Sequence, residues 1–103
     1  MPRVVALHGF IGSGNDFDPL RECLDSSYEI QSPDLPGHGK LAHQTHPSDY
    51  SLASHLEIIS KASGQDNEPI ILVGYSMGGR IAMHWALKYP NRIQRLILIL
   101  SLI

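Results

Sequence analysis

This sequence of 103 residues has a single cysteine, few aromatic side chains and no excess of basic residues. Because Cys23 has no partner for a disulfide within the chain, a reducing compartment is expected, and the cytoplasm is the expected location. A formal net charge of −2 argues against nucleic acid or an anionic membrane as the main partner. Neither a secretory signal nor an apolar segment long enough to cross a membrane is evident, so no membrane partner is expected.

The composition indicates a globular chain and at most one domain, residues 1–103. Hydrophobic residues make up 43% and charged residues 17% of the sequence, which excludes the disordered class. Strands are predicted at residues 3–7, 28–32, 69–73 and 96–100, which are apolar and partly β-branched. Apolar strands that alternate with helices indicate the α/β class, with a mostly parallel sheet covered by helices on both faces.

Helices are predicted in the segments between these strands. Asp16 or Asp18 is the candidate cap of a short first helix. Ser51 is the candidate cap of a second helix, which runs to about Lys61. A third helix follows Ser76. The predicted elements therefore alternate between strand and helix along the chain, without internal repeats.

A Gly-Tyr-Ser-Met-Gly sequence at residues 74–78 stands between the third predicted strand and the helix that follows it. A G-x-S-x-G sequence at such a junction is typical of a nucleophile elbow, because its two glycines permit a turn tight enough to free the serine hydroxyl. The helix that begins there has unpaired N–H groups, which can stabilise a developing oxyanion. Ser76 is therefore the candidate nucleophile, and a capping serine in an ordinary glycine turn is the alternative.

Three motifs follow the first three predicted strands, and together they resemble the amino-terminal part of the α/β-hydrolase fold family. They are Leu-His-Gly-Phe at residues 7–10, Asp-Leu-Pro-Gly-His-Gly at residues 34–39 and Gly-Tyr-Ser-Met-Gly-Gly at residues 74–79. The resemblance implies that the first strand lies between the second and the third. It also implies an oxyanion hole formed by the N–H groups of Phe10 and Met77.

Residues 74–83 have a narrower resemblance, to the succinyl-hydroxy-cyclohexadiene-carboxylate synthases of menaquinone biosynthesis, because Tyr75 precedes the serine and Arg80 follows it by four positions. That resemblance implies elimination of pyruvate from a small anionic substrate with several carboxylates. A guanidinium one helical turn from the serine is suited to hold a carboxylate by two hydrogen bonds. Arg80, Tyr75 and His8 are thus the candidate substrate-binding residues; an ordinary surface arginine and a structural His-Gly pair are the alternatives.

The sequence departs from this family where the rest of a catalytic triad is expected. In this fold the serine is followed by an Asp or Glu and then by a His. No Asp or Glu follows Ser76, and the single later histidine, His84, lies about 12 Å away along the helix at ~1.5 Å per residue. A serine without a base is a weak nucleophile. We interpret the chain as a truncated α/β-hydrolase domain that lacks the last strands and the lid, shortened by a stop, a frameshift or a chosen boundary.

Three alternatives to the synthase function stay open. One is an ester or thioester hydrolase of the same fold, and another is an inactive fragment or non-catalytic binding module. The third is dinucleotide binding, since a glycine-rich loop at residues 9–14 and an Asp34 that ends the next strand imitate a dinucleotide fingerprint. Against it, the glycine spacing is not G-x-G-x-x-G, and the serine motif is left unexplained.

The expected partners are few. We expect no cofactor and no metal, because no pair of His, Cys or carboxylate residues shows zinc-type spacing with matching partners. A small-molecule substrate is expected instead. The apolar segment at residues 96–103 is expected to favour self-association, because an exposed apolar strand tends to recruit another chain.

Overall fold

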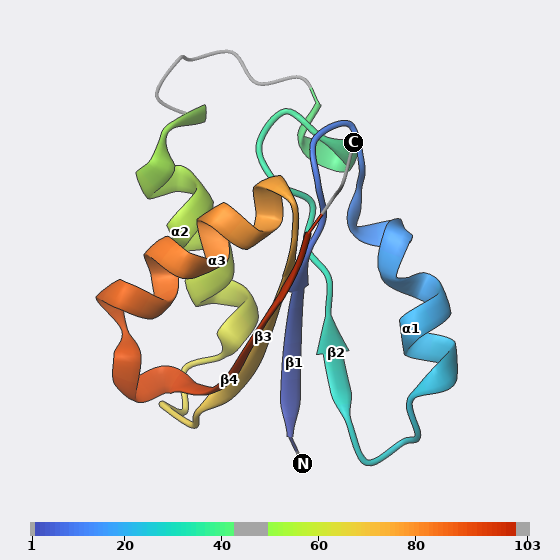
Figure 1. Cartoon of the computed structure of the whole chain (residues 1–103), viewed down its shortest axis with the longest axis vertical. Coiled ribbons are helices and arrows are strands. Elements are labelled where there is room, and N and C mark those ends of the chain that lie inside the picture. The colour runs from blue at the N-terminus through green and yellow to red at the C-terminus, as the bar shows by residue number, and fades with distance from the viewer. Residues whose placement is uncertain (1, 43–49, 101–103) are drawn as a thin grey trace.

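The computed structural model describes residues 2–42 and 50–100 as alternating strands and helices (Figure 1). With η for a short 3-10 helix, the elements in chain order are β1 (Arg3–Leu7), η1 (Gly14–Phe17), α1 (Asp18–Cys23), β2 (Glu29–Gln31), η2 (Gly39–Leu41), α2 (Leu52–Ser63), β3 (Ile70–Tyr75), α3 (Met77–Lys88), η4 (Pro90–Arg92) and β4 (Ile93–Ile99). Within these described residues, no helix has both the length and the apolar character needed to cross a lipid bilayer.

The strands form one parallel sheet in the order β2-β1-β3-β4. β1 therefore lies between β2 and β3, as the family resemblance implied, and the predicted α/β class is confirmed. α1 lies on one face of the sheet, and α2 and α3 lie on the other (Figure 1). Because the strands all run in the same direction, the loops after β1, β2 and β3 meet at one edge of the sheet, where α/β proteins bind ligands.

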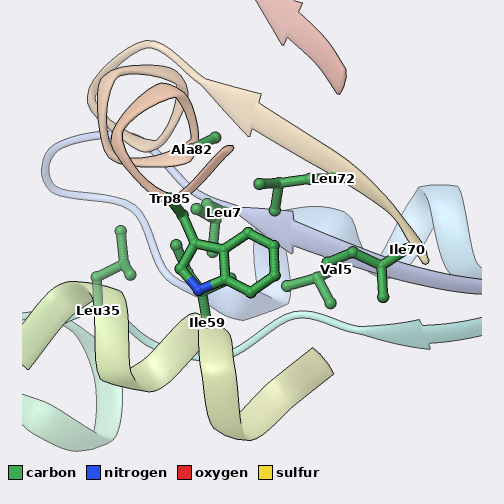
Figure 2. Close-up of a cluster of buried hydrophobic side chains, with 8 residues drawn as sticks. All are labelled: Val5, Leu7, Leu35, Ile59, Ile70, Leu72, Ala82 and Trp85. Carbon is green, nitrogen blue, oxygen red and sulfur yellow. The ribbon is translucent and has the colours of Figure 1, made fainter. Parts of the chain in front are cut away.

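Each face of the sheet has its own core, because alternate residues of β1 point to opposite faces. The core towards α2 and α3 comprises Val5, Leu7, Leu35, Ile59, Ile70, Leu72, Ala82 and Trp85 (Figure 2). The core towards α1 comprises Val4, Ala6, Phe17 and Val73. Trp85 is the largest fully buried side chain, and its indole N–H donates to the Ser60 hydroxyl at 3.0 Å, so its polar group is satisfied inside the core.

Three strands differ from their predicted boundaries. β3 covers Ile70–Tyr75, where residues 69–73 were predicted. β4 begins at Ile93 rather than at residue 96. The polar residues Gln94 and Arg95 hid this start in the sequence, but the strand accepts them because it is largely exposed. β2 is limited to Glu29–Gln31, inside the predicted range of 28–32. Residues 101–103, the end of the segment predicted to favour self-association, lie outside the described residues.

The predicted helix caps have different outcomes. Ser51 caps α2 as predicted, because its hydroxyl accepts a backbone N–H of the first turn at 3.1 Å. The prediction that Asp16 or Asp18 caps the first helix is wrong, because Phe17 occupies the cap position and supplies no side-chain bond. The Asp16 carboxylate instead accepts the N–H of Ser13 at 3.3 Å, at the start of the preceding 3-10 helix.

Candidate active site

Ser76 is the residue between β3 and α3, and the backbone turns sharply there, with φ at +52° and ψ at −112°. A left-handed φ is disfavoured for a residue with a side chain, so the surrounding structure must hold it. The Ser76 N–H donates to the carbonyl of Ile99 at 3.0 Å, and the Ser76 carbonyl accepts the N–H of Gly79 at 2.9 Å. Ser76 is exposed, at the end of a strand, in the tight turn that the motif predicted. Its role as nucleophile stays a prediction.

Two glycines make this turn possible, because neither position has room for a side chain. A Cβ on Gly74 would lie 2.6 Å from the carbonyl oxygen of Gly78, and a Cβ on Gly78 would lie 2.3 Å from the carbonyl oxygen of Leu7. Both obstacles are backbone atoms, which cannot swing aside as the end of a side chain can. The start of α3 therefore lies directly against the end of β1, where the loop that carries Phe10 begins.

The two predicted oxyanion-hole residues come together beside this turn. Phe10 lies in the loop after β1, and Met77 opens α3. In the part of the chain that the structure describes, neither N–H has a hydrogen-bond acceptor. The Met77 N–H is also one of those that a helix start leaves unpaired, at the positive end of the helix dipole. Both residues line a hollow of about 530 Å³. Their role as an oxyanion hole stays a prediction.

The predicted substrate-binding residues Arg80 and Tyr75 lie on either side of the serine. Arg80 is exposed in the first turn of α3, and it lines with Ser76 a second hollow of about 230 Å³. Tyr75 is 39% exposed, and its ring lies over Gly9, where a Cβ would come within 2.9 Å of it. The structure thus brings Arg80 to the candidate nucleophile and Tyr75 to the loop after β1. Their contacts with a substrate stay predictions.

His8 is only 1% exposed, and both of its ring nitrogens are engaged inside the chain. Nδ1 donates to the Gly9 carbonyl at 2.8 Å, and Nε2 accepts the N–H of Leu35 at 3.0 Å. Because a backbone N–H can only donate, Nε2 carries no proton and the ring is neutral. Burial lowers the pKa of His8; the bond to Gly9 opposes this effect, and the neighbouring His38 adds to it. These bonds support the structural alternative for His8, and substrate contact stays a prediction.

Asp34, which is part of the dinucleotide alternative, bonds to backbone groups of its own chain. Its Oδ1 accepts the N–H of Gly14 at 2.8 Å, and its Oδ2 accepts the N–H of Lys40 at 3.0 Å. Burial raises the pKa of this carboxyl, but the two N–H donors outweigh that effect and leave the pKa lowered. Both oxygens therefore join loops, which is a structural role that needs no dinucleotide.

Three residues of the site were not predicted as site residues. His38, Tyr50 and His55 line the hollow shared by Phe10 and Met77. His55 is half-buried. No sequence pattern indicates this, because the start of α2 reaches the hollow only through tertiary packing. Among residues 2–42 and 50–100, no three His, Cys, Asp or Glu side chains lie close enough together to hold a metal ion.

Comparison with known proteins identifies the family to which this geometry belongs. The family model described as "alpha/beta hydrolase fold" matches residues 2–102. Among solved structures, the thioesterase domain from the curacin biosynthetic pathway superposes with a TM-score of 0.85 at 33% sequence identity. That match covers 98% of this chain and 38% of the thioesterase chain.

Two curated relatives have different activities. The putative 2-succinyl-6-hydroxy-2,4-cyclohexadiene-1-carboxylate synthase of Bacillus subtilis (strain 168) is 36% identical over 96 residues, which cover 92% of this chain and 35% of the relative. The pimeloyl-[acyl-carrier protein] methyl ester esterase of Pseudoalteromonas atlantica is 32% identical over 98 residues, which cover 95% of this chain and 36% of the relative. The chain therefore spans about a third of the length of these two relatives.

Proposed function

The chain belongs to the alpha/beta hydrolase fold family, and from that premise we propose that it supplies the nucleophile and the oxyanion hole of a serine-dependent active site. In this proposal the Ser76 hydroxyl reacts with the substrate, and the N–H groups of Phe10 and Met77 stabilise the negative charge that develops on oxygen. The observation that carries the proposal is an exposed serine with φ at +52° at a strand-to-helix junction. Its neighbour Met77 and the loop residue Phe10 line one hollow, and neither of their N–H groups has an acceptor among the described residues.

The proposed reaction also needs a base for the serine proton and a carboxylate that orients the base. Residues 77–103 contain no Asp or Glu, and His84 lies about 12 Å from Ser76 along α3 at ~1.5 Å per residue. Residues 77–103 therefore supply neither group in the order that this fold uses. Because loss of a triad histidine lowers turnover by a factor on the order of 10⁶, the 103-residue chain alone is expected to have negligible turnover.

The proposed substrate is a small molecule with a carboxylate. Arg80 favours this class, because its guanidinium lines a hollow with Ser76 and can bind a carboxylate by two hydrogen bonds. In the synthase version, deprotonated Ser76 takes a proton from a substrate carbon, and the electron pair left behind forms a C=C bond. The C–O bond to the leaving group breaks, and pyruvate leaves as its enolate, which then takes up a proton. The 36% identical synthase relative supports this version.

The second candidate function is hydrolysis of an ester or thioester. Here Ser76 Oγ forms an acyl-enzyme, the alcohol or thiol leaves, and water then cleaves the acyl group. The 32% identical esterase relative and the 33% identical thioesterase structure support this version. A version of this chain that includes a base for Ser76 distinguishes the two: pyruvate release from the menaquinone intermediate supports the synthase, whereas rapid p-nitrophenyl acetate hydrolysis without pyruvate release supports the hydrolase.

Labelling by a fluorophosphonate tests the nucleophile directly on the 103-residue chain. We expect slow labelling of Ser76, and we expect added imidazole to accelerate it roughly tenfold or more, because a positioned base contributes roughly 10²–10⁴-fold and a free one recovers part of that. Intact mass and peptide mapping measure the rate and the site.

Two variants make this labelling experiment decisive. Ser76→Ala should abolish the labelling with and without imidazole, and Ser27→Ala, which changes an exposed serine in the turn before β2, should leave the rate unchanged. Equal labelling of Ser76→Ala and the parent chain would refute the proposed role of the serine.

A further inference from the structure

The loop after β1 contains a residue whose backbone conformation is disfavoured by its side chain. Ile11 has φ at +60°, at the third position of a four-residue turn that the Gly12 N–H closes on the Gly9 carbonyl at 3.0 Å. This left-handed region suits glycine, and a β-branched residue there is an outlier. The Ile11 side chain is 87% exposed, so packing of that side chain does not hold the turn. Contacts made by the backbone must do so.

His38 provides such a contact from a loop that is distant in sequence. Its Nε2 accepts the N–H of Ile11 at 3.0 Å, and its Nδ1 donates to the carbonyl of Pro36 at 3.0 Å. The ring also lies edge-on to Phe10, with 5.8 Å between centroids, and is tilted against His8, with 4.9 Å between centroids. His38 thus contacts the turn both through a hydrogen bond and through the ring of Phe10.

The partners of His38 also fix where its proton lies. The Ile11 N–H can only donate, so Nε2 must offer a lone pair, and the Pro36 carbonyl can only accept, so Nδ1 must carry the proton. The imidazole is therefore neutral, with a defined tautomer. A doubly protonated ring would have no lone pair for Ile11.

We propose that His38 is a positioning residue for the oxyanion hole: by accepting the Ile11 N–H at Nε2, it fixes the turn at residues 9–12 and with it the direction of the Phe10 N–H. Because Phe10 and Ile11 share a peptide unit, a change in the Ile11 N–H direction also changes the backbone torsion of Phe10. The catalytic meaning of this positioning rests on the proposed function, whereas the hydrogen bond and the tautomer do not.

A pair of substitutions separates the two hydrogen bonds of the ring. In His38→Gln, the amide oxygen lies as many bonds from the backbone as Nε2 and can accept the Ile11 N–H. In His38→Asn, the shorter amide reaches the position of Nδ1 and keeps only the Pro36 bond. Both variants lose the ring, so a difference between them reports the Ile11 bond and not the loss of ring contacts.

Nuclear magnetic resonance gives the readout that does not depend on catalysis. In the unchanged 103-residue chain, we expect the His38 ring nitrogens to report a neutral ring with the proton on Nδ1. Hydrogen-exchange protection of the Ile11 amide should stay within about twofold in His38→Gln and fall about three- to tenfold in His38→Asn, the range expected for one hydrogen bond. Equal protection in the two variants, or a proton on Nε2, would overturn the proposal.

Fluorophosphonate labelling of Ser76 gives the functional readout. The rate should follow the amide result, about unchanged in His38→Gln and about three- to tenfold slower in His38→Asn, with the exposed His84→Asn as a control at the parental rate. If the parent chain does not label at Ser76, the proposed function fails, while the tautomer and the Ile11 amide still decide the inference. If His38→Asn does not fold, the tautomer in the unchanged chain and the His38→Gln protection decide it.

Discussion

The loops at the carboxyl edge of the sheet are distant in the sequence, and two polar side chains, His8 and Asp34, join them. His8 links the start of the loop after β1 to the N–H of Leu35, and Asp34 links that loop to Lys40 through backbone N–H groups. Loop backbone has no ladder partners of its own, so its N–H groups need such acceptors when they leave water. These residues shape the site although neither is placed to react.

His8 leads to a prediction about stability and pH. Burial lowers its pKa below the ordinary value of 6.5, so the unfolded chain binds a proton at this ring at a higher pH than the folded chain does. The stabilisation is therefore complete above about pH 6.5 and decreases as the pH falls from there towards the lower pKa of the folded state. Urea unfolding of the parent chain at pH 8 and at pH 5.5 measures this loss.

The same unfolding experiment on His8→Ala isolates the contribution of this ring. At pH 8 we expect a loss of about 1–3 kcal/mol, because the Leu35 N–H is left without an acceptor in a buried place. The difference between pH 8 and pH 5.5 should also become smaller than in the parent chain. His84→Asn, on the exposed side of α3, should change neither quantity. A His8→Ala variant with the parental pH dependence would show that another group is responsible.

The turn between β3 and α3 gives a prediction at the scale of elements. Gly78→Ala places a Cβ 2.3 Å from the Leu7 carbonyl oxygen, so the start of α3 must move away from β1. We expect a loss of about 1–3 kcal/mol or more in the free energy of unfolding, as for other overpacked sites. Thermal or urea denaturation measures it.

Gly79→Ala is the matched control, one position further along the same helix. Its nearest obstacle is the Gly74 carbonyl oxygen at 3.3 Å, a tight contact but one that a small shift relieves. Alanine also favours a helix over glycine by about 0.5–1 kcal/mol, which offsets that strain. We expect Gly79→Ala to stay within about 1 kcal/mol of the parent chain, by the same propensity difference. Equal losses in the two variants would contradict the steric explanation.

The elements that could be predicted are those whose own residues carry the pattern of a strand or the cap of a helix. The apolar residues of β1 and β3 and the serine cap of α2 carry their own pattern, and the structure places these elements accordingly. β4 was predicted too short, because Gln94 and Arg95 interrupt the apolar pattern in a strand whose exposure tolerates them. The prediction of the first helix cap was wrong because Asp16 bonds within the 3-10 helix that precedes α1, where Ser13 and Asp16 have the S-x-x-D spacing of a capping box.

The candidate site likewise has parts that the sequence predicts and parts that only the folded structure shows. The strained turn at Ser76 could be predicted, because its glycines and its place between a strand and a helix are visible in the sequence. The bond from the Ile11 N–H to His38 could not, since it joins two loops that only the folded sheet brings together. The contribution of Tyr50 and His55 to the hollow was missed for the same reason.

Across the whole molecule, the sheet is covered unevenly. β1 is buried along most of its length, whereas β4 is exposed along nearly all of it. The exposed apolar side chains at this end of the sheet are Leu96, Ile97, Leu98, Ile99 and Leu100. Within the described residues β4 pairs only with β3, so its other edge offers backbone N–H and carbonyl groups to another strand.

We propose that the 103-residue chain self-associates through β4, and Ile97→Lys tests this. Ile97 lines an apolar hollow with Leu20 and Val73 on the face towards α1, so a charge there opposes burial of that face in a complex. Loss of one buried isoleucine removes about 1.5–3 kcal/mol, and the association constant should fall roughly tenfold or more.

Sedimentation at several concentrations should show the parent chain above its monomer mass of 11.4 kDa and Ile97→Lys closer to it. Leu87→Lys, an equally drastic change at an exposed position on α3, should leave the distribution unchanged; a parent chain that stays monomeric at every concentration would refute the association.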